Sequence, residues 1–430
     1  MTVSREAPPG AVVSGPMPDV AAVQRRTVRV LSVSQALTGI AVVGSIPAGA
    51  LIAEGVAGNE AAAGLAQTFG VLGAALAALP LARITLASGR RRALTLGLGA
   101  GAIGATLVVI GAAGRVLPLV FLGTLLVGCA TAAGYQARYA AADLAVPERR
   151  GRALSIVVWA STVGAVLGPN LLEASGRLAL SFGLPQLSGP YLVAAFCLTL
   201  AVLVLVALRP DPYLLARRLA VAAGEATDGA RTSLRDGIAH VRRHPGARLG
   251  MASIALGHAV MVMVMVMTPV HMRHVDVRLQ LIGLVISVHV AGMYALSPLV
   301  GWAADRLGRV PVLAVGVAVL AGACVLAAWV DADDVLGLGI ALFLLGLGWS
   351  CTLIAGSTLL VEDVDAADRP AVQGASDLAM NVAGAVGGAV AGLVVALASY
   401  ALLCLIALVP VALLGALILR RPRTASSPAG

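Results

Sequence analysis

The sequence contains no lysine, and only 12% of its 430 residues are charged. Hydrophobic residues make up 59% of the chain, and the mean hydropathy is +0.94. About a quarter of the residues of a soluble domain are normally charged. The shortage of charge therefore excludes a soluble globular protein and indicates a chain that lies largely in lipid.

Features of enzymes and of metal-cluster proteins are also missing. None of the five cysteines has the paired spacing of a zinc knuckle or of a disulfide framework, and we interpret them as buried apolar thiols. The sequence has no Walker loop, which excludes an ATP-driven pump built from this chain alone, and no nucleophile–base spacing. We therefore expect no enzymatic activity and no bound cofactor.

Long apolar stretches recur along nearly the whole chain. A helix needs about 20 apolar residues to cross a bilayer, and in lipid it must satisfy its own backbone hydrogen bonds. Twelve stretches meet this requirement: 29–53, 61–82, 93–114, 116–142, 153–172, 190–208, 248–270, 281–303, 311–330, 335–361, 371–396 and 399–419. The sequence therefore predicts an all-α membrane protein with twelve transmembrane helices.

The basic residues, all of them arginine, are distributed unevenly between the connections. They cluster before the first stretch and after every second one, whereas the opposite loops hold only Arg115, Arg177, Arg273 and Arg278. The positive-inside rule then places both termini in the cytoplasm, in a multi-pass protein of the plasma membrane. The net charge of +9 thus reflects topology, and we expect no nucleic-acid partner.

The longest polar stretch divides the chain into two similar parts. We expect a disordered cytoplasmic tail over 1–28, six helices over 29–208, a cytoplasmic loop over 209–247, six helices over 248–419 and a second cytoplasmic tail over 420–430. Arg150-Gly-Arg-Ala and the Gly168-Pro169 region align with Arg369-Pro-Ala-Val and Gly387-Gly388 at one constant offset. Internal repeats of this kind are typical of secondary transporters, whose substrate site lies near the midplane between the halves.

One loop carries a specific motif. Gly301-Trp-Ala-Ala-Asp305-Arg306-Leu-Gly308-Arg309 resembles the pattern Gly-x-x-x-Asp-Arg-x-Gly-Arg of the major facilitator superfamily. The copy expected after the second helix keeps a glycine and the arginines but lacks the Asp-Arg pair, and the connection 143–153 is also typical of the family. The resemblance covers the whole chain, and it implies two pseudo-symmetric six-helix halves that transport by alternating access.

The same resemblance implies a latch at the cytoplasmic face. Gly301 permits close helix approach, and Asp305 is suited to cap a helix N-terminus or to pair with an arginine such as Arg152. With Arg306, Gly308 and Arg309, these residues form the predicted gating motif. A charged loop that only fixes topology is the alternative interpretation.

Methionine and histidine are concentrated near the start of the second half. At 100° per residue, Met261 and Met265 share a helix face with His258, and the two methionines that alternate with them lie on the opposite face. His289 and Met293 are four residues apart on the next helix and also share a face. Two facing helices are therefore predicted to present thioether and imidazole groups to one site.

Met-x-x-x-Met followed by His-x-x-x-Met resembles the metal-binding motifs of a superfamily subgroup that imports copper for cytochrome oxidase assembly. The resemblance carries over to Met261 and Met265, then to His289 and Met293. Copper accepts such ligands, and here it would be the substrate. Methionine is also an ordinary gap-filler in helix cores, so simple packing stays open as the alternative.

Two charged residues lie within the expected helices. Asp377 and Arg138 are costly in lipid, so we expect them to face the protein interior. Both are candidates for proton coupling, and a structural pair of Asp377 with an arginine is the alternative. For Arg138 an interhelical partner is favoured, because Asp143 is badly placed on the same helix.

These motifs leave the cargo open between two classes. Gly164-Ala-Val-Leu-Gly168-Pro169 resembles part of the superfamily's antiporter motif, although Asn170 replaces an expected glycine. Copper uptake is the preferred hypothesis, and proton-coupled efflux of drugs or hydrophobic metabolites is the alternative; a sensor on a transporter scaffold is disfavoured by the intact loop motif. We expect a monomer in the lipid bilayer that binds a small-molecule or metal-ion substrate.

Overall fold

The chain is described by a computed structural model over residues 19–58, 61–223, 234–273, 275–362, 364–365 and 368–420. Much of the two expected tails therefore lies outside the described residues. The first half contains α1 (Val20–Ala57), α2 (Ala61–Ser88), α3 (Arg90–Gly114), α4 (Leu117–Ala140), η1 (Pro147–Arg149), α5 (Arg150–Asn170), α6 (Leu172–Ser181), η2 (Gln186–Ser188) and α7 (Gly189–Leu205). The remainder contains α8 (Pro212–Ala222), α9 (Leu234–Arg243), α10 (Pro245–Arg273), α11 (Leu279–Tyr294), α12 (Ser297–Arg306), α13 (Arg309–Trp329), α14 (Val335–Glu362), α15 (Arg369–Leu397), α16 (Tyr400–Ile406) and α17 (Leu408–Leu419).

The described residues form helices and no strands, as the composition predicts. Eleven segments among them are long and apolar enough to cross a membrane. The twelfth expected span is occupied by α5, which is 21 residues long. The prediction of an all-α, multi-pass membrane protein is confirmed.

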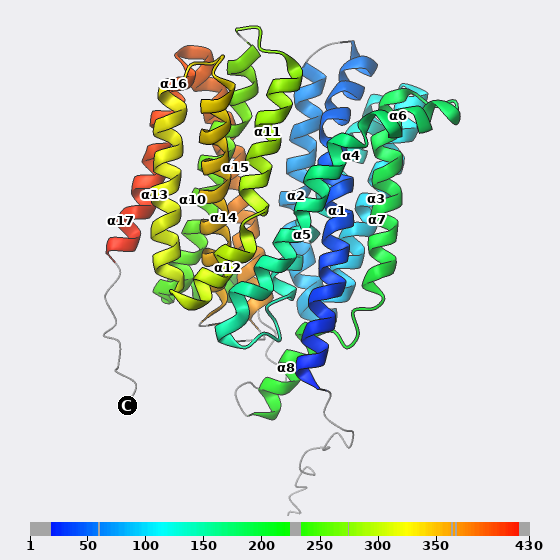
Figure 1. The fold of residues 1–430 in the computed structure, drawn as a ribbon. Helices are drawn as coiled ribbons and strands as arrows, with labels where there is room; N and C mark the ends of the chain where they lie inside the picture. The colour runs from blue at the N-terminus through cyan, green and yellow to red at the C-terminus, as the bar shows by residue number, and fades with distance from the viewer. Residues whose placement is uncertain are drawn as a thin grey trace, which may run out of the picture.

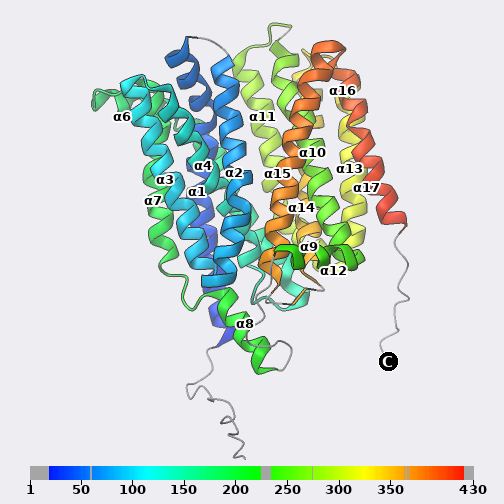
Figure 2. The same ribbon diagram turned by 180° about the vertical axis from the view of Figure 1, so that it is seen from behind.

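The helices form two bundles that lie side by side, α1 to α7 and α10 to α17 (Figure 1). The start of α1 and the end of α17 lie at the same face of the molecule, which we call the terminal face. The short helices α8 and α9 also lie at this face (Figure 2). They fall within the polar stretch that was expected to connect the halves.

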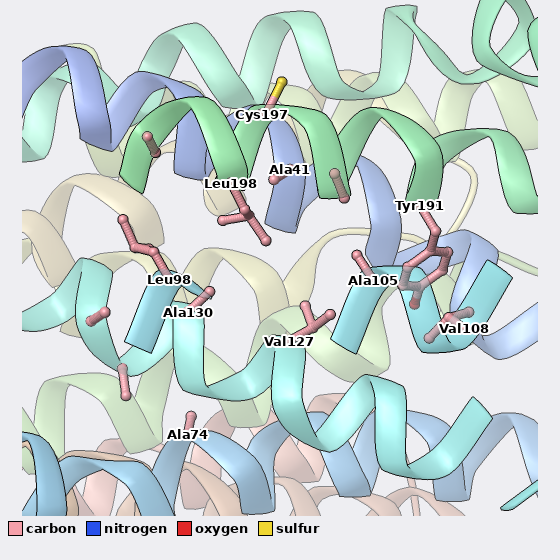
Figure 3. Packing of buried hydrophobic residues seen from close by; sticks show 14 of the residues in the cluster. Ala41, Ala74, Leu98, Ala105, Val108, Val127, Ala130, Tyr191, Cys197 and Leu198 are labelled. Carbon is pink, nitrogen blue, oxygen red and sulfur yellow. The ribbon is translucent and has the colours of Figure 1, made fainter. Parts of the chain in front are cut away.

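Small side chains hold the first bundle together. In lipid, helices associate through close packing of small residues rather than through the hydrophobic effect. Figure 3 shows this core, in which alanines of several helices interleave with larger side chains: Ala41, Ala74, Ala105, Ala130, Leu98, Val127 and Leu198. Where α3 crosses α4 the backbones themselves touch, since a Cβ on Gly123 would lie 2.6 Å from the carbonyl oxygen of Gly104.

Two spans that were predicted as single helices are interrupted. The span 281–303 is divided into α11 and α12 because Pro298 has no N–H to give to the carbonyl of Tyr294, which accepts the Ser297 hydroxyl instead at 2.6 Å. The last span is divided in the same way: α16 ends at Ile406, four residues before Pro410. Proline thus sets both interruptions.

Candidate functional site

The two halves meet along a few helices. α2 packs against α15, and α5 packs against α11 and α12. At this interface lies a small cavity of about 30 Å³. Its lining comes from α1, α4 and α5 of the first half and from α11 and α14 of the second: Gln35, Gly134, Tyr135, Arg138, Val157, Val158, Ser161, Tyr294, Trp349 and Leu353. None of the residues predicted to bind metal is among them.

A buried ion pair joins the halves beside this cavity. Nη2 of Arg138 on α4 donates to Oδ1 of Asp377 on α15 at 2.8 Å, and both side chains are nearly inaccessible to solvent. The same nitrogen lies 3.2 Å from the hydroxyl of Tyr139, and the guanidinium sits over the rings of Tyr139 and Tyr135 at 4.6 and 5.5 Å. The two residues predicted as proton-coupling candidates are therefore each other's partners.

The pair is incompletely satisfied within the described part of the chain. Nε of Arg138 and Oδ2 of Asp377 are both buried and lack a hydrogen-bond partner there. Buried polar atoms are nearly always hydrogen-bonded, so such exceptions often mark functional positions. Arg138 also lines the cavity, which gives its guanidinium access to a bound molecule.

The second half supplies the aromatic wall of the cavity. Nε1 of Trp349 on α14 donates to Nδ1 of His258 on α10 at 3.2 Å, which fixes the indole. Tyr294 on α11 meets Trp349 edge-on, with ring centroids 5.8 Å apart. From the first half, the amide of Gln35 donates to the hydroxyl of Ser161 at 3.0 Å. The cavity thus combines an aromatic wall with polar groups from the first half.

The predicted metal ligands are only partly brought together. Met261 and Met293 belong to one buried cluster with Trp349, and Met265 packs at its edge. His258 is engaged by the Trp349 indole. His289 is fully buried, and its Nδ1 lies 2.8 Å from the carbonyl oxygen of Leu342 on α14, while its Nε2 has no partner among the described residues.

The gating motif connects the halves at the terminal face. Oδ1 and Oδ2 of Asp305 accept hydrogen bonds from the backbone N–H groups of Gly151 and Arg152 at 3.0 and 2.8 Å. These N–H groups open α5, so the carboxylate caps a helix N-terminus of the other half. Gly301 packs on the same turn, since a Cβ there would lie 2.6 Å from the Gly151 carbonyl oxygen.

The arginines of the motif have different roles. Arg309 donates to the carbonyl of Pro147 in the first half at 2.7 Å and lies 3.6 Å from Glu362. Arg306 is exposed and lies over the ring of Trp302, 5.8 Å from its centroid, on its own helix. Gly308 has φ of 93°, which lets the chain turn sharply into α13.

The reduced first copy of the motif also reaches across the interface. Gly89 makes the same turn, with φ of 87°. The next residue, Arg90, is buried and donates to both carboxylate oxygens of Asp143 at 2.8 and 3.2 Å and to the amide oxygen of Gln373 on α15. The sequence placed Arg90 in this reduced copy and among the arginines that indicate topology, but these contacts were not predicted.

The internal repeat could have identified this network. Arg90 aligns with Arg309, and Asp143 aligns with Glu362, at the same offset of 219 residues (309 − 90 and 362 − 143). Arg90 lies close to Asp143 in space, and Arg309 lies close to Glu362. At that offset Leu86 stands where the second half has Asp305, so the first half has no equivalent carboxylate cap.

The glycines of the helix-5 motif bring α5 against α1. A Cβ on Gly164 would lie 2.4 Å from the Cα of Gly39, and one on Gly168 would lie 2.9 Å from the backbone nitrogen of Gly44. The two helices therefore touch through their backbones, a contact that any larger residue would prevent. Pro169 lies in the last turn of α5, and its side chain is outside the described part.

Comparisons with known proteins agree with this architecture. The sequence profile of the Major Facilitator Superfamily matches residues 31–278 and 250–430. The uncharacterized MFS-type transporter YdeG of Bacillus subtilis (strain 168) is 39% identical over 383 residues, which cover 89% of this chain and 88% of YdeG. The riboflavin transporter RfnT of Brucella anthropi is 28% identical over 356 residues, covering 83% of this chain and 85% of RfnT.

A solved structure shows the same fold. The proton:xylose symporter XylE superposes with a TM-score of 0.68 at 14% sequence identity, over 93% of this chain and 96% of that one. The family profile, the relatives and the two-bundle fold together give one assignment. The chain belongs to the major facilitator superfamily, and it is a membrane-embedded secondary transporter rather than an enzyme.

Proposed function

We propose that this transporter moves organic solutes that carry an aromatic ring, and that it couples their movement to protons through Arg138 and Asp377. The observation that carries this proposal is the buried pair between α4 and α15, which lies beside the cavity and joins the halves. Protonation of the carboxylate weakens the pair. A proton therefore acts directly on an inter-half contact and on the binding cavity.

Alternating access gives the pair its role in the transport cycle. Asp305 accepts a hydrogen bond from the other half at the terminal face, and Arg309 and Arg90 donate hydrogen bonds across it. The arginine distribution supports a cytoplasmic position for this face, and in that orientation this conformation is closed to the cytoplasm. Opening requires that these latch contacts and the Arg138–Asp377 pair be released together.

The cavity wall favours an aromatic solute. Trp349 and Tyr294 present ring surfaces, and stacking or edge contacts between rings are favourable beyond the area they bury. Gln35 and Ser161 of the first half add hydrogen-bonding groups to the lining. The relationship to the riboflavin transporter RfnT supports a planar heterocycle as one member of the substrate class.

Reconstituted protein tests this function. In proteoliposomes with a pH gradient, we expect accumulation of an aromatic solute such as riboflavin or 2-naphthoate. Asp377→Asn should abolish the pH-driven component and retain solute exchange at equal pH, because the amide keeps the shape but takes up no proton. Full pH-driven transport by this variant, or no transport of any aromatic probe by the wild type, would exclude the proposal.

Copper uptake is a second candidate, with the ion as cargo. It is favoured by the thioethers of Met261 and Met293 in one buried cluster, with Met265 at its edge, and by the unpartnered Nε2 of His289. Sulfur and imidazole nitrogen suit Cu(I). Under this hypothesis Met261→Leu and Met293→Leu should lower cellular copper, whereas Met263→Leu, in the second-half core, should leave it unchanged. Equal copper content in all three variants would exclude it.

Proton-coupled efflux of drugs or hydrophobic metabolites uses the same coupling pair in the opposite direction. The close packing of Gly164 and Gly168 on α1 is compatible with it.

We further propose a monomer in the plasma membrane with both termini in the cytoplasm. A fluorescent protein fused after residue 430 should fluoresce inside cells, and a periplasmic or extracellular location of that fusion would contradict this orientation.

A further inference from the structure

We propose that Arg138 binds an anionic group of the solute, so that the cargo is an aromatic carboxylate or a similar organic anion that moves together with one proton. This inference rests on the proposed function and deepens it. It assigns a substrate class to the cavity, a role to the unpartnered atoms of the pair, and a charge balance to the transport cycle.

The two buried arginines of the interface differ in how fully they are engaged. Arg90 uses both Nε and Nη2 on the carboxylate of Asp143 and also donates to Gln373. Arg138 engages Asp377 through Nη2 alone, and its Nε has no partner among the described residues. A guanidinium carries five N–H donors in a fixed fork. Arg138 therefore keeps donors for a ligand, whereas Arg90 is committed to the protein.

Arg138 is also one of the residues at the cavity. Its side chain lines the cavity between the halves together with the aromatic pair Trp349 and Tyr294. A planar carboxylate matches the guanidinium fork through two parallel hydrogen bonds. A molecule that carries both a ring and a carboxylate could therefore contact both kinds of group once the halves move apart and the small cavity widens.

Charge balance links anion binding to protonation. In the described state the guanidinium and the Asp377 carboxylate cancel each other. An anion that enters beside an ionised Asp377 adds a buried negative charge that has no counterion. When a proton binds Asp377, its N–H···O contact with Arg138 weakens and the guanidinium is left as an unpaired buried cation, which is strongly unfavourable. The anion then takes the place of the carboxylate, and the site remains neutral overall.

Among the described residues, the surroundings of the pair supply no alternative counter-charge. The titratable side chains that face it are Tyr135 and Tyr139 of α4, Tyr294 of α11 and His258 of α10, and Arg90 of α3 also acts on Asp377. His258 already accepts the Trp349 N–H, and Arg90 is paired with Asp143. Asp377 is therefore the carboxylate that exchanges with the anion.

The test compares two probes that differ only in charge. Binding of 2-naphthoate and of 2-naphthamide to the purified full chain in nanodiscs is measured between pH 6 and pH 8.5. The wild type should bind naphthoate more tightly than naphthamide, with naphthoate affinity rising as the pH falls. Arg138→Gln should lower naphthoate affinity roughly 10- to 100-fold, as expected for a charge-assisted hydrogen bond. Naphthamide affinity should change little, which also shows that this variant is folded.

Two further variants complete the test. Asp377→Asn imitates the protonated acid, so its naphthoate affinity should be high and independent of pH. Arg177→Gln, an exposed arginine on α6, is the control and should behave as wild type. Equal binding of both probes by the wild type would overturn the inference and leave a neutral aromatic cargo under the proposed function. If neither probe binds, the inference and the proposed function both fail.

Discussion

At the scale of single residues, the interface depends on whether each buried charge has its partner. Asp143 is the partner of Arg90, and both side chains are almost completely buried. Removing one member of such a pair leaves the other charge uncompensated, which costs about 3–5 kcal/mol. Asp143→Ala should therefore lower the free energy of unfolding by this amount, and detergent-purified protein should unfold at a lower temperature. Asp331→Ala, at an exposed position, is the control, and equal losses in both variants would show that Arg90 does not depend on Asp143.

Gly301 illustrates a residue whose small size allows the latch to close. A Cβ at this position would lie 2.2 Å from the hydroxyl oxygen of Ser155 in the other half. We expect Gly301→Leu to keep the terminal face open, so that Ser161→Cys in the cavity reacts faster with a thiol reagent added from the side of the terminal face. Gly322→Leu on α13 is the matched control, because a Cβ there meets no atom within 4 Å. Unchanged labelling in Gly301→Leu would show that closure tolerates the larger side chain.

At the scale of helices, one carboxylate connects α8 to the start of α3. Asp211 accepts from the backbone N–H of Arg91 at 2.8 Å and from those of Tyr213 and Leu214 at 3.1 and 3.2 Å. Loss of a side-chain cap costs about 0.5–2 kcal/mol. Asp211→Ala should therefore speed amide hydrogen exchange at the beginnings of both α3 and α8. Asp334→Ala, which removes a bond to Gly337 near the start of α14, should affect that helix alone. If Asp211→Ala speeds exchange in α8 but not in α3, the connection to α3 is contradicted.

The helices also show what the sequence could and could not predict. Apolar length predicted the spans, because the thickness of the bilayer imposes it. The interruptions near Ser297 and Pro410 were missed although proline signals them, since hydropathy averages over such residues. Helix periodicity correctly separated Met261 from Met263, which lie in different clusters. Periodicity says nothing about the facing helix, so neither the bond of His258 to Trp349 nor that of His289 to Leu342 was predictable.

The sequence predicted that buried charges need partners on other helices, but it did not predict which residues pair between the halves. An arginine and an aspartate inside a bilayer need partners, and this argument correctly led to an interhelical partner for Arg138. Its identity depends on how α4 and α15 are aligned across the interface, which one sequence does not encode locally. The contact from Arg90 to Gln373 depends on the same alignment.

At the scale of the whole molecule, the interface must open and close without dissociation of the halves. α2 and α15 meet closely at the terminal face, where a Cβ on Gly374 would lie 2.4 Å from that of Ala82. Cysteines at these two positions are within reach of a disulfide after a small adjustment. We therefore expect Ala82→Cys/Gly374→Cys to crosslink under mild oxidation in the closed state.

Cleavage between the halves makes this crosslink measurable without knowledge of the cargo. A protease site inserted between α8 and α9 separates the two bundles on a denaturing gel, and the disulfide should keep them together until reductant is added. Each single cysteine variant controls for the five native cysteines, which are free in the structure. Adding Gly301→Leu should reduce the yield of crosslink. This substitution holds the contact between α5 and α12 open, and if each half moves as a rigid body, α2 then also separates from α15. An unchanged yield would mean that the two sides of the terminal face open independently.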